Sequence, residues 1–221
     1  MSGGFDIIGL VGPAESGKDT CAGVLAKLGG FVLVAFADRL RVELVEAFGV
    51  DPAMFTDRSR KELPVFELAI GRCADGRFIR RMVETGHDCT AARSPRQLMQ
   101  LWGTEYRRVC DGRDYWTEQV NLQLHTLIQA GHRRICVSDV RFMNEAAYVL
   151  QVDGVLWRIR RDSRRRVDAQ HESETQQEAI QCETVIANDA RLEDFIDRVG
   201  LAYAHHRRRL SSLGEVAHGL G

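Results

Sequence analysis

Apolar positions along the chain fall into five short continuous runs that are separated by longer amphipathic stretches. The runs cover residues 5–11, 31–36, 134–138, 154–159 and 184–187. Continuous apolar runs are typical of strands buried on both faces, and strands that alternate with helices form parallel sheets with right-handed crossovers. The pattern therefore predicts an α/β fold with a five-stranded parallel sheet and helices on both faces.

Apolar residues at helical spacing predict the helices between these strands. Val24, Leu25 and Leu28 share one side of a helix that follows Gly17. The same spacing predicts helices over residues 38–48, 115–130, 142–152 and 192–199.

Another helix is expected to start at Ser94, because Pro95 and Gln97 then occupy the first-turn and capping-box positions. Its apolar stripe is Leu98, Leu101, Trp102 and Val109, which leaves Arg96, Gln100, Thr104 and Arg107 on the opposite side.

The remaining segments carry weaker patterns. Residues 49–93 contain several Pro and Gly breaks and are interpreted as an insertion with one short helix near 65–70. The tail from Ala202 onward is interpreted as a loose end or an oligomer contact. No second-domain linker is visible, so residues 1–221 are expected to form a single domain.

Composition narrows the class of protein. With 44% apolar residues and no apolar run near the roughly 18 residues of a membrane span, we expect a globular protein that does not enter a membrane. The 30 basic and 31 acidic side chains leave a net charge of −1, which argues against a surface that is basic all over and binds bulk nucleic acid, but leaves room for a local basic patch. Six scattered cysteines without a CxxC pair, and a start that lacks a signal peptide, favour free thiols in the cytoplasm.

A phosphate-binding loop is the strongest chemical signal. Residues 12–20 read GPAESGKDT, which is GxxxxGK placed between a predicted strand and a predicted helix. Glycines let backbone N–H groups turn toward an anion, the start of the helix adds partial positive charge, and Lys18 reaches the terminal phosphates. We therefore expect ATP binding at Gly12, Glu15, Ser16, Gly17, Lys18, Asp19 and Thr20.

The residue after Lys18 departs from the usual motif, which has Ser or Thr there. Asp19 offers Mg²⁺ a carboxylate oxygen, directly or through a water, since magnesium prefers oxygen ligands. The alternative is that Asp19 only caps the helix.

Five blocks together resemble the deoxynucleotide monophosphate kinases of tailed phages, and they occur in that family's order. They are SGKDT at 16–20, RQLMQxxGT at 96–104, DYW at 114–116, SDVR at 138–141 and VIANDARLEDFIDRV at 185–199. The resemblance implies a P-loop kinase that moves the γ-phosphate of ATP to a deoxynucleoside 5′-monophosphate with Mg²⁺. It also implies a homodimer, a lid at about 160–180 and, for a phage-encoded chain, a place in the host cytoplasm. The resemblance does not extend to residues 49–93, which we interpret as an acceptor-side insertion, or to the last twenty residues.

The resemblance assigns roles to residues at the ends of strands. Asp139 follows an apolar strand, where Walker-B carboxylates hold Mg²⁺, and Arg141 lies near the same edge as a clamp for the acceptor phosphate. The alternative is structural: Asp139 would cap the next helix and Arg141 would pair with Glu145.

Acceptor recognition is expected at two further places. Arg96 is assigned to phosphate and Gln100 or Thr104 to the base or sugar, against the alternative of a solvated helix face. Asp38 and Arg39 follow the second strand and are expected to border the acceptor pocket.

The lid region contains six arginines between Arg158 and Arg166. Arg161 and Arg164 are the predicted phosphate contacts, because closure of a lid brings guanidinium forks onto ATP and excludes water. Asn188 is expected to touch adenine or to cap the last helix.

Two other functions fit the same motifs. One is a kinase for a hydroxymethylated pyrimidine base in phage DNA, in which Asp38 would be the general base. The other is a non-enzymatic nucleotide-binding module.

Overall fold

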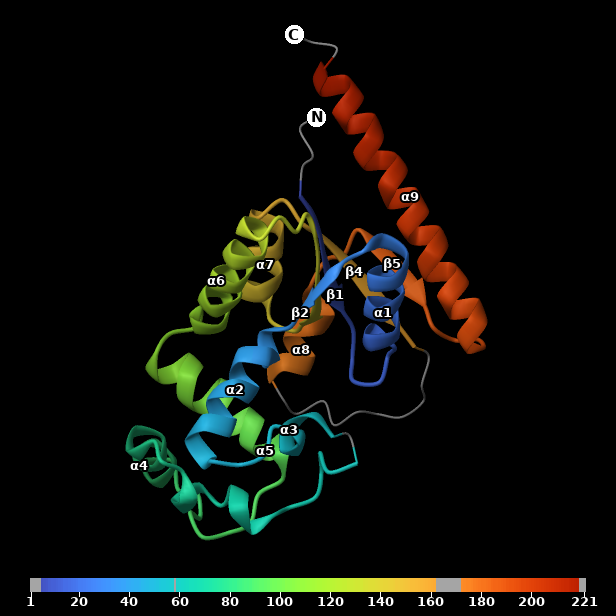
Figure 1. Ribbon diagram of the computed structural model, residues 1–221. Coiled ribbons are helices and arrows are strands. Elements are labelled where there is room, and N and C mark those ends of the chain that lie inside the picture. Colours follow the sequence, from blue (N-terminus) through green and yellow to red (C-terminus); the bar gives the residue numbers. More distant parts are fainter. Residues whose placement is uncertain (1–4, 58, 162–171, 219–221) are drawn as a thin grey trace. The chain divides into compact units, whose positions relative to one another are not determined.

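The computed structural model describes residues 5–57, 59–161 and 172–218, with side chains for 5–57, 59–161 and 176–212 (Figure 1). The chain divides into two compact units. The first consists of Met1–Ala35 and Leu124–Gly221, and the second is Phe36–Gln123.

The first unit is built on the predicted parallel sheet. Its strands are β1 (Asp6–Val11), β2 (Val32–Val34), β3 (Arg134–Val140), β4 (Val155–Arg160) and β5 (Thr184–Ala187). They pair in the order β2-β3-β1-β4-β5, and every pair is parallel. The prediction of a five-stranded parallel α/β sheet is confirmed. The chain leaves the central strand β1 toward β2 on one side and later returns to β4 on the other, and ligands bind at such switch points in open sheets.

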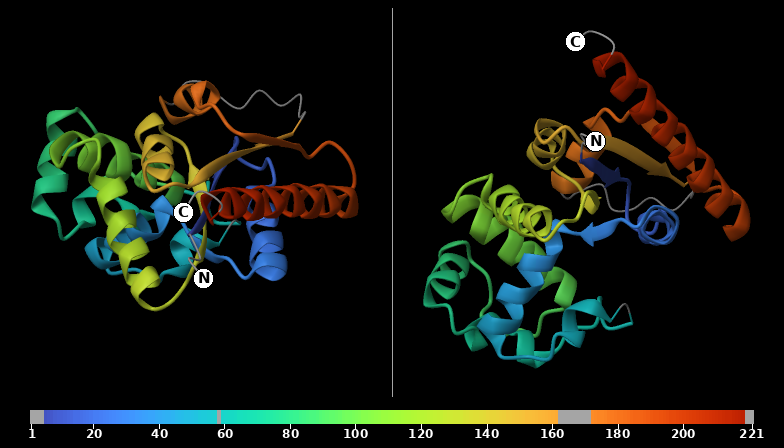
Figure 2. Two further views of the ribbon diagram at one scale, coloured as in Figure 1. Left: turned by 90° about the horizontal axis from the view of Figure 1, so that it is seen from above. Right: turned by 45° about the horizontal axis from the view of Figure 1, so that its top comes forward.

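Helices cover both faces of this sheet. They are α1 (Lys18–Gly29), α7 (Met143–Gln151), α8 (Glu172–Ala179) and α9 (Leu192–His218). The boundary between the two units falls within α6 (Tyr115–Gln129), after Gln123. Helices α1 and α9 lie side by side on one face (Figure 2). Their apolar side chains bury Ile8, Leu10 and Trp157, whereas Gly9 faces Val149 of α7 on the other side.

Helix α9 is longer than the sequence pattern predicts. The expected end at Val199 is wrong, because Tyr203 and His206 continue the buried stripe after Gly200. His206 Nε2 lies 2.8 Å from Asp6 Oδ1, and both side chains are buried. The interpretation of the tail as a loose end is therefore wrong as far as His206; the helix continues to His218, and the alternative of an oligomer contact stays a prediction.

The second unit is helical. It contains α2 (Phe36–Phe48), α3 (Ala53–Thr56), α4 (Gly76–Glu84), α5 (Pro95–Gln100), a π-helical segment η3 (Leu101–Arg108), and two 3-10 turns, η1 (Phe66–Leu68) and η2 (Ile70–Arg72). The short helix expected near 65–70 is thus a pair of 3-10 turns, and α4 was not predicted.

The predicted start of α5 is confirmed. Ser94 Oγ accepts from the Gln97 N–H at 3.2 Å, and Gln97 Oε1 accepts from the Ser94 N–H at 3.0 Å. Leu98, Leu101 and Trp102 are buried as predicted, but Val109 is exposed. The π-helical turns of η3 contain more residues than α-helical turns, so the apolar stripe shifts before it reaches Val109.

An aromatic core holds the second unit together. The rings of Phe78, Trp102 and Tyr106 lie with centroids 4.8 to 5.4 Å apart. All six cysteines are free thiols. None of the helices in the described ranges combines the length and apolar composition needed to cross a bilayer.

Candidate active site

The loop between β1 and α1 depends on glycines at both ends. A Cβ at Gly12 would lie 2.4 Å from the Ile159 carbonyl oxygen, and one at Gly17 would lie 2.5 Å from Asn188 Nδ2. Gly17 also has φ 109° as the N-cap of α1. Between them Glu15 has φ 62°, which costs a non-glycine residue conformational energy and is common at ligand-binding sites. The backbone is thus shaped as a tight cradle.

Two polar side chains are buried inside this cradle. Ser16 is 1% exposed, and its hydroxyl has no hydrogen-bond partner within the described part of the chain. Lys18 is 8% exposed, and its ammonium donates to the carbonyl oxygens of Gly12 and, at 2.7 Å, Pro13. A buried hydroxyl, a buried ammonium and the start of α1 together fit an anionic group such as a phosphate.

Two residues from much later in the chain hydrogen-bond to the backbone of the cradle. Asn188 Nδ2 donates to the Ser16 carbonyl at 2.8 Å, and a guanidinium nitrogen of Arg161 donates to the Glu15 carbonyl at 3.3 Å. Asn188 does not cap α9, which begins at Leu192, so that alternative is wrong. Arg164 lies outside the described residues, and its assignment to ATP stays a prediction.

The carboxyl end of β3 lies next to the cradle in the sheet. Gly9 pairs with Val137 and Val11 with Val140, so Ser138 and Asp139 together oppose one residue of β1. Such a bulge redirects side chains and is frequent beside active sites. Asp139 is half-buried there.

Asp19, the second candidate for Mg²⁺, lies exposed in the first turn of α1. Gly17 is the N-cap, so the interpretation of Asp19 as the cap is wrong. No group of three or more His, Cys, Asp or Glu side chains suited to a metal occurs in the described ranges. Mg²⁺ is commonly held by one or two carboxylates together with waters and substrate phosphates, a donor set that Asp19 and Asp139 fit.

The turn after β3 is organised by Glu145. This buried carboxylate accepts from the backbone N–H groups of Arg141, at 2.8 Å, and Phe142, at 3.1 Å. No ion pair between the Arg141 and Glu145 side chains occurs among the described residues, and the N-cap of α7 is Phe142 rather than Asp139, so the structural alternative for these two residues is wrong.

The predicted acceptor residues Asp38, Arg39, Arg96, Gln100 and Thr104 all belong to the second unit. Arg96 pairs with Glu62 at 3.1 Å, and Asp38 accepts from Arg41 at 2.8 Å. Gln100 ends α5, Thr104 lies in η3, and both are half-buried. Their contacts to an acceptor stay predictions.

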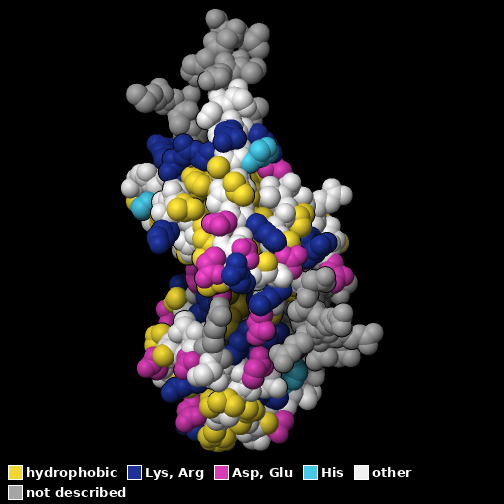
Figure 3. Space-filling model, turned by 90° about the vertical axis from the view of Figure 1, so that its right-hand side faces the viewer, with side chains coloured by type: hydrophobic (Ala, Val, Ile, Leu, Met, Phe, Trp, Pro, Cys, Tyr) yellow, Lys and Arg dark blue, Asp and Glu magenta, His cyan; other side chains and the backbone are white. Residues whose placement is uncertain are grey.

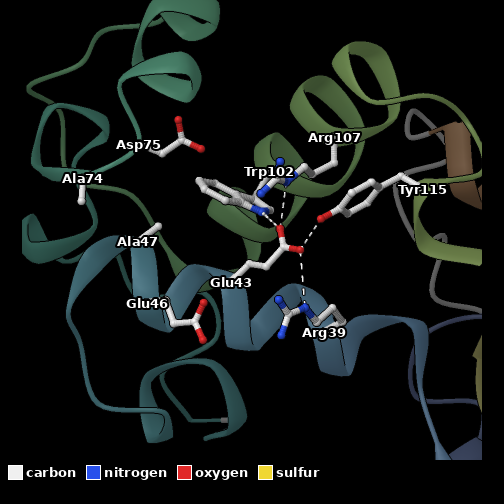
Figure 4. Close-up of a pocket in the computed structure, with 9 residues that line it drawn as sticks. All are labelled: Arg39, Glu43, Glu46, Ala47, Ala74, Asp75, Trp102, Arg107 and Tyr115. Atoms are coloured by element: carbon white, nitrogen blue, oxygen red, sulfur yellow. Dashed lines mark hydrogen bonds and ion pairs between the residues drawn. The ribbon is translucent and has the colours of Figure 1, made fainter. Parts of the chain in front are cut away.

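The second unit contains a buried carboxylate, Glu43, that the sequence did not indicate and that several polar side chains surround (Figure 4). Glu43 is 5% exposed and accepts from Trp102 Nε1 at 2.9 Å, Arg107 Nε at 2.8 Å and the Tyr115 hydroxyl at 2.5 Å. Arg39 Nε lies 3.7 Å away. The spacing of Arg39, Glu43 and Ala47 along α2 fits an exposed helix face equally well, so the sequence carries no signal that would have found this carboxylate.

These groups border a pocket of about 370 Å³, whose other lining residues are Glu46, Ala47, Ala74 and Asp75. Burial and the bond to Glu43 raise the pKa of Tyr115 to about 12. Burial alone would lower the pKa of Arg107, but Asp111 and Glu43 outweigh it and hold that pKa above its usual range. Arg107 therefore stays charged inside the unit.

Charges of both signs are interspersed over the face drawn in Figure 3, apart from a group of basic side chains near its upper end. On α9 the exposed arginines Arg207, Arg208 and Arg209 follow one another. This distribution agrees with the near-zero net charge.

Comparison with known proteins identifies the family. The model of deoxynucleotide monophosphate kinases matches residues 61–199. A protein of Acanthamoeba polyphaga mimivirus, provisionally named a deoxynucleotide monophosphate kinase, is 29% identical over 203 residues, 87% of this chain and 93% of the relative.

Two solved kinases also overlay on the chain. Dephospho-CoA kinase from Campylobacter jejuni has 12% identity and a TM-score of 0.47, over 98% of this chain and 100% of that one. A sugar kinase from Janibacter has 14% identity and a TM-score of 0.42, over 88% of this chain and 91% of that one.

Because the family match spans more than half of the residues, the chain belongs to the deoxynucleotide monophosphate kinase family and is an ATP-dependent nucleotide kinase.

Proposed function

We propose that the chain transfers the γ-phosphate of ATP to the 5′-phosphate of a deoxynucleoside monophosphate, in a reaction that requires Mg²⁺. The observation that carries this proposal is the glycine-bounded cradle, which lies beside the bulged strand end at Asp139. It contains the buried Lys18 and a Ser16 hydroxyl that no described residue hydrogen-bonds. Such a cradle fits the phosphates of ATP.

The chemistry needs little proton transfer. An acceptor phosphate is largely a dianion at pH 7, because its second pKa is about 6. One of its oxygens bonds to the γ-phosphorus while the bond to the bridging oxygen of ADP breaks. Catalysis of this step rests on alignment and charge stabilisation, which Lys18 supplies at the ATP phosphates and Arg141 at the acceptor phosphate.

Asp19 and Asp139 are the proposed Mg²⁺ ligands, directly or through waters. When bound, the ion neutralises charge on the β- and γ-phosphate oxygens. Asp19 lies in the first turn of α1, the helix that follows β1, and Asp139 lies near the carboxyl end of β3. Strands β1 and β3 are neighbours in the sheet.

Acceptor binding is proposed for the second unit, at Asp38, Arg39, Arg96, Gln100 and Thr104, with residues 49–93 as the insertion on the acceptor side. The lid expected at residues 160–180 is proposed for the part before α8, because Arg158 of β4 holds the end of that helix; Arg161 and Arg164 are the residues proposed to approach ATP. The loop with Asn188 is proposed to border adenine.

A hydroxymethylated pyrimidine in DNA remains the second candidate acceptor. An alcohol needs a general base, and Asp38, the candidate, is already paired with Arg41 at 2.8 Å. DNA also favours a basic groove, whereas the net charge is −1. Both observations favour free nucleotides.

A steady-state screen tests the proposal. The four deoxynucleoside monophosphates, their ribose counterparts and hydroxymethylated duplex DNA are each offered with ATP, with and without Mg²⁺, and products are separated by chromatography. We expect deoxynucleoside diphosphates only when Mg²⁺ is present. Turnover on DNA alone would overturn the proposal.

Arg141→Ala sharpens the screen. We expect kcat/KM for the acceptor to fall about 100-fold, because a clamp on a charged phosphate is lost, while KM for ATP changes less than about threefold. Exposed Arg133→Ala is the matched control.

The homodimer and the host cytoplasm also stay predictions, and light scattering during size-exclusion chromatography tests the dimer.

A further inference from the structure

The turn that carries Asp139 and Arg141 is held by side chains at four successive residues. The Val140 carbonyl accepts from Gln177 Nε2 at 3.2 Å. The N–H groups of Arg141 and Phe142 donate to Glu145, and the Met143 N–H donates to Gln176 Oε1 at 3.1 Å. Two of these contacts come from α8, a helix about 35 residues further along the chain.

Helix α8 is itself fixed to the sheet. A guanidinium nitrogen of Arg158 donates to the carbonyl oxygens of Gln177, at 3.1 Å, and Ile180, at 2.5 Å, at the carboxyl end of α8. In the sheet register, Val11 pairs with Arg158 on one side and with Val140 on the other. Arg158, Val11 and Val140 therefore form one row across three strands, immediately before the phosphate cradle.

The buried side chain of Gln177 is not explained by packing alone. It is 5% exposed, and burying an amide costs free energy unless the amide is hydrogen-bonded, so an apolar residue of similar size would fill the same space without that cost. Its N–H donates to β3 where the register of β1 and β3 shifts. The bond thus fixes the backbone from which Asp139 and Arg141 project.

We infer that Gln177 is a positioning residue, which sets the direction of Arg141 toward the acceptor phosphate through the Val140 carbonyl. The inference rests on the proposed function, in which Arg141 holds that phosphate. The cradle for the ATP phosphates is held separately, by Asn188 and Arg161, so Gln177 acts more strongly on acceptor binding than on ATP binding, to which it contributes only through Asp139.

The test uses the full chain and two substitutions of similar length, Gln177→Leu and Gln177→Met, which remove the donor. Exposed Glu178→Gln on the same helix is the matched control. We expect kcat/KM for the acceptor to fall about tenfold or more, since small displacements of a positioning group are costly, with KM for ATP within about twofold of wild type. A merely structural role would not separate the two substrates.

A double-mutant cycle with Arg141→Ala identifies the route of the effect. If Gln177 acts through Arg141, Gln177→Leu costs less than about twofold further once Arg141 is removed. An equal loss in both backgrounds overturns the inference, as does an equal rise of both KM values. Failure of both Gln177 variants to fold overturns it too, because Gln177 would then serve stability. A wild-type protein without turnover on any deoxynucleoside monophosphate contradicts the proposed function instead.

Discussion

The side-chain amide of Asn188 donates to the carbonyl oxygen of Ser16 at 2.8 Å, which ties the loop after β5 to the middle of the phosphate cradle. The two residues are 172 positions apart. The missing Cβ of Gly17 leaves the space that the amide occupies, since a Cβ would lie 2.5 Å from Nδ2. The shape of the cradle therefore depends on two segments of the first unit that are far apart in the sequence.

Asn188→Ala should weaken ATP binding. Loss of the amide frees the Ser16 carbonyl, and we expect the Kd of a non-hydrolysable ATP analogue to rise about tenfold by calorimetry, the size of one lost hydrogen bond. Asn188→Asp should do the same, because it lacks the N–H donor. Asp189→Asn, which loses only an exposed pair with Arg198, is the control and should change the Kd less than twofold. An unchanged Kd in Asn188→Ala would show that Asn188 does not shape the cradle.

Lys18→Ala should lower kcat by about a thousandfold or more. Lys18 is the buried cation of the cradle, and its charge acts on phosphate oxygens whose charge redistributes in the transition state. Lys27→Ala, which removes an exposed lysine from the last turn of the same helix, should leave turnover unchanged. Steady-state kinetics with ATP and the preferred acceptor measures both variants. If Lys18→Ala turned over about as fast as wild type, the assignment of residues 12–20 as the ATP-binding P-loop would be wrong.

The sheet and its cradle could be predicted because their signals are local. Continuous apolar runs mark buried strands, and GxxxxGK requires its geometry within nine residues. Helix α4 was not predicted because Asp75-Gly76 is typical of a turn in the sequence, whereas in the structure Asp75 is the N-cap and accepts from the N–H groups of Arg77 and Phe78. Gly200 likewise concealed the continuation of α9 to Tyr203 and His206.

The contacts that position the site could not be predicted, because they join distant segments through polar side chains. Glu43 has the sequence context of an exposed helix face, yet its partners lie 59 to 72 positions away. Arg158 was counted with the lid arginines but binds the end of α8. Polar residues carry no periodic signal that distinguishes a buried partner from a solvated one.

Glu43→Gln should destabilise the second unit. The substitution keeps the size of the side chain but removes the charge that faces the half-buried Arg107, and breaking a largely buried ion pair costs about 3 kcal/mol of the free energy of unfolding. Asp111 keeps Arg107 partly paired, at 3.0 Å, which places the expected loss at the lower end of the range. Denaturant unfolding followed by tryptophan fluorescence reports it, since Trp102 is a partner of Glu43.

Glu46→Gln is the control for this prediction. Glu46 lines the same pocket one turn along α2 but is exposed, and its substitution should change the free energy of unfolding by less than about 0.5 kcal/mol. If both variants lose the same stability, Glu43 contributes no more than an exposed carboxylate.

Tyr115 should make stability fall in alkaline solution. Burial and the bond to Glu43 raise its pKa to about 12, against about 10 for an unperturbed tyrosine, so the folded protein holds this proton more tightly than the unfolded chain does. The resulting stabilisation is complete below pH 10 and is lost as the pH rises through about 12.

The thiol of Cys73 and the hydroxyl of Tyr148 also have raised pKa values, about 11 and about 12, so the stability of the wild type is compared with that of Tyr115→Phe. The difference in unfolding free energy between wild type and Tyr115→Phe should stay constant from pH 7 to 9.5 and shrink above pH 10. Parallel stability curves up to pH 12 would mean that the Tyr115 hydroxyl titrates alike in the folded and unfolded states.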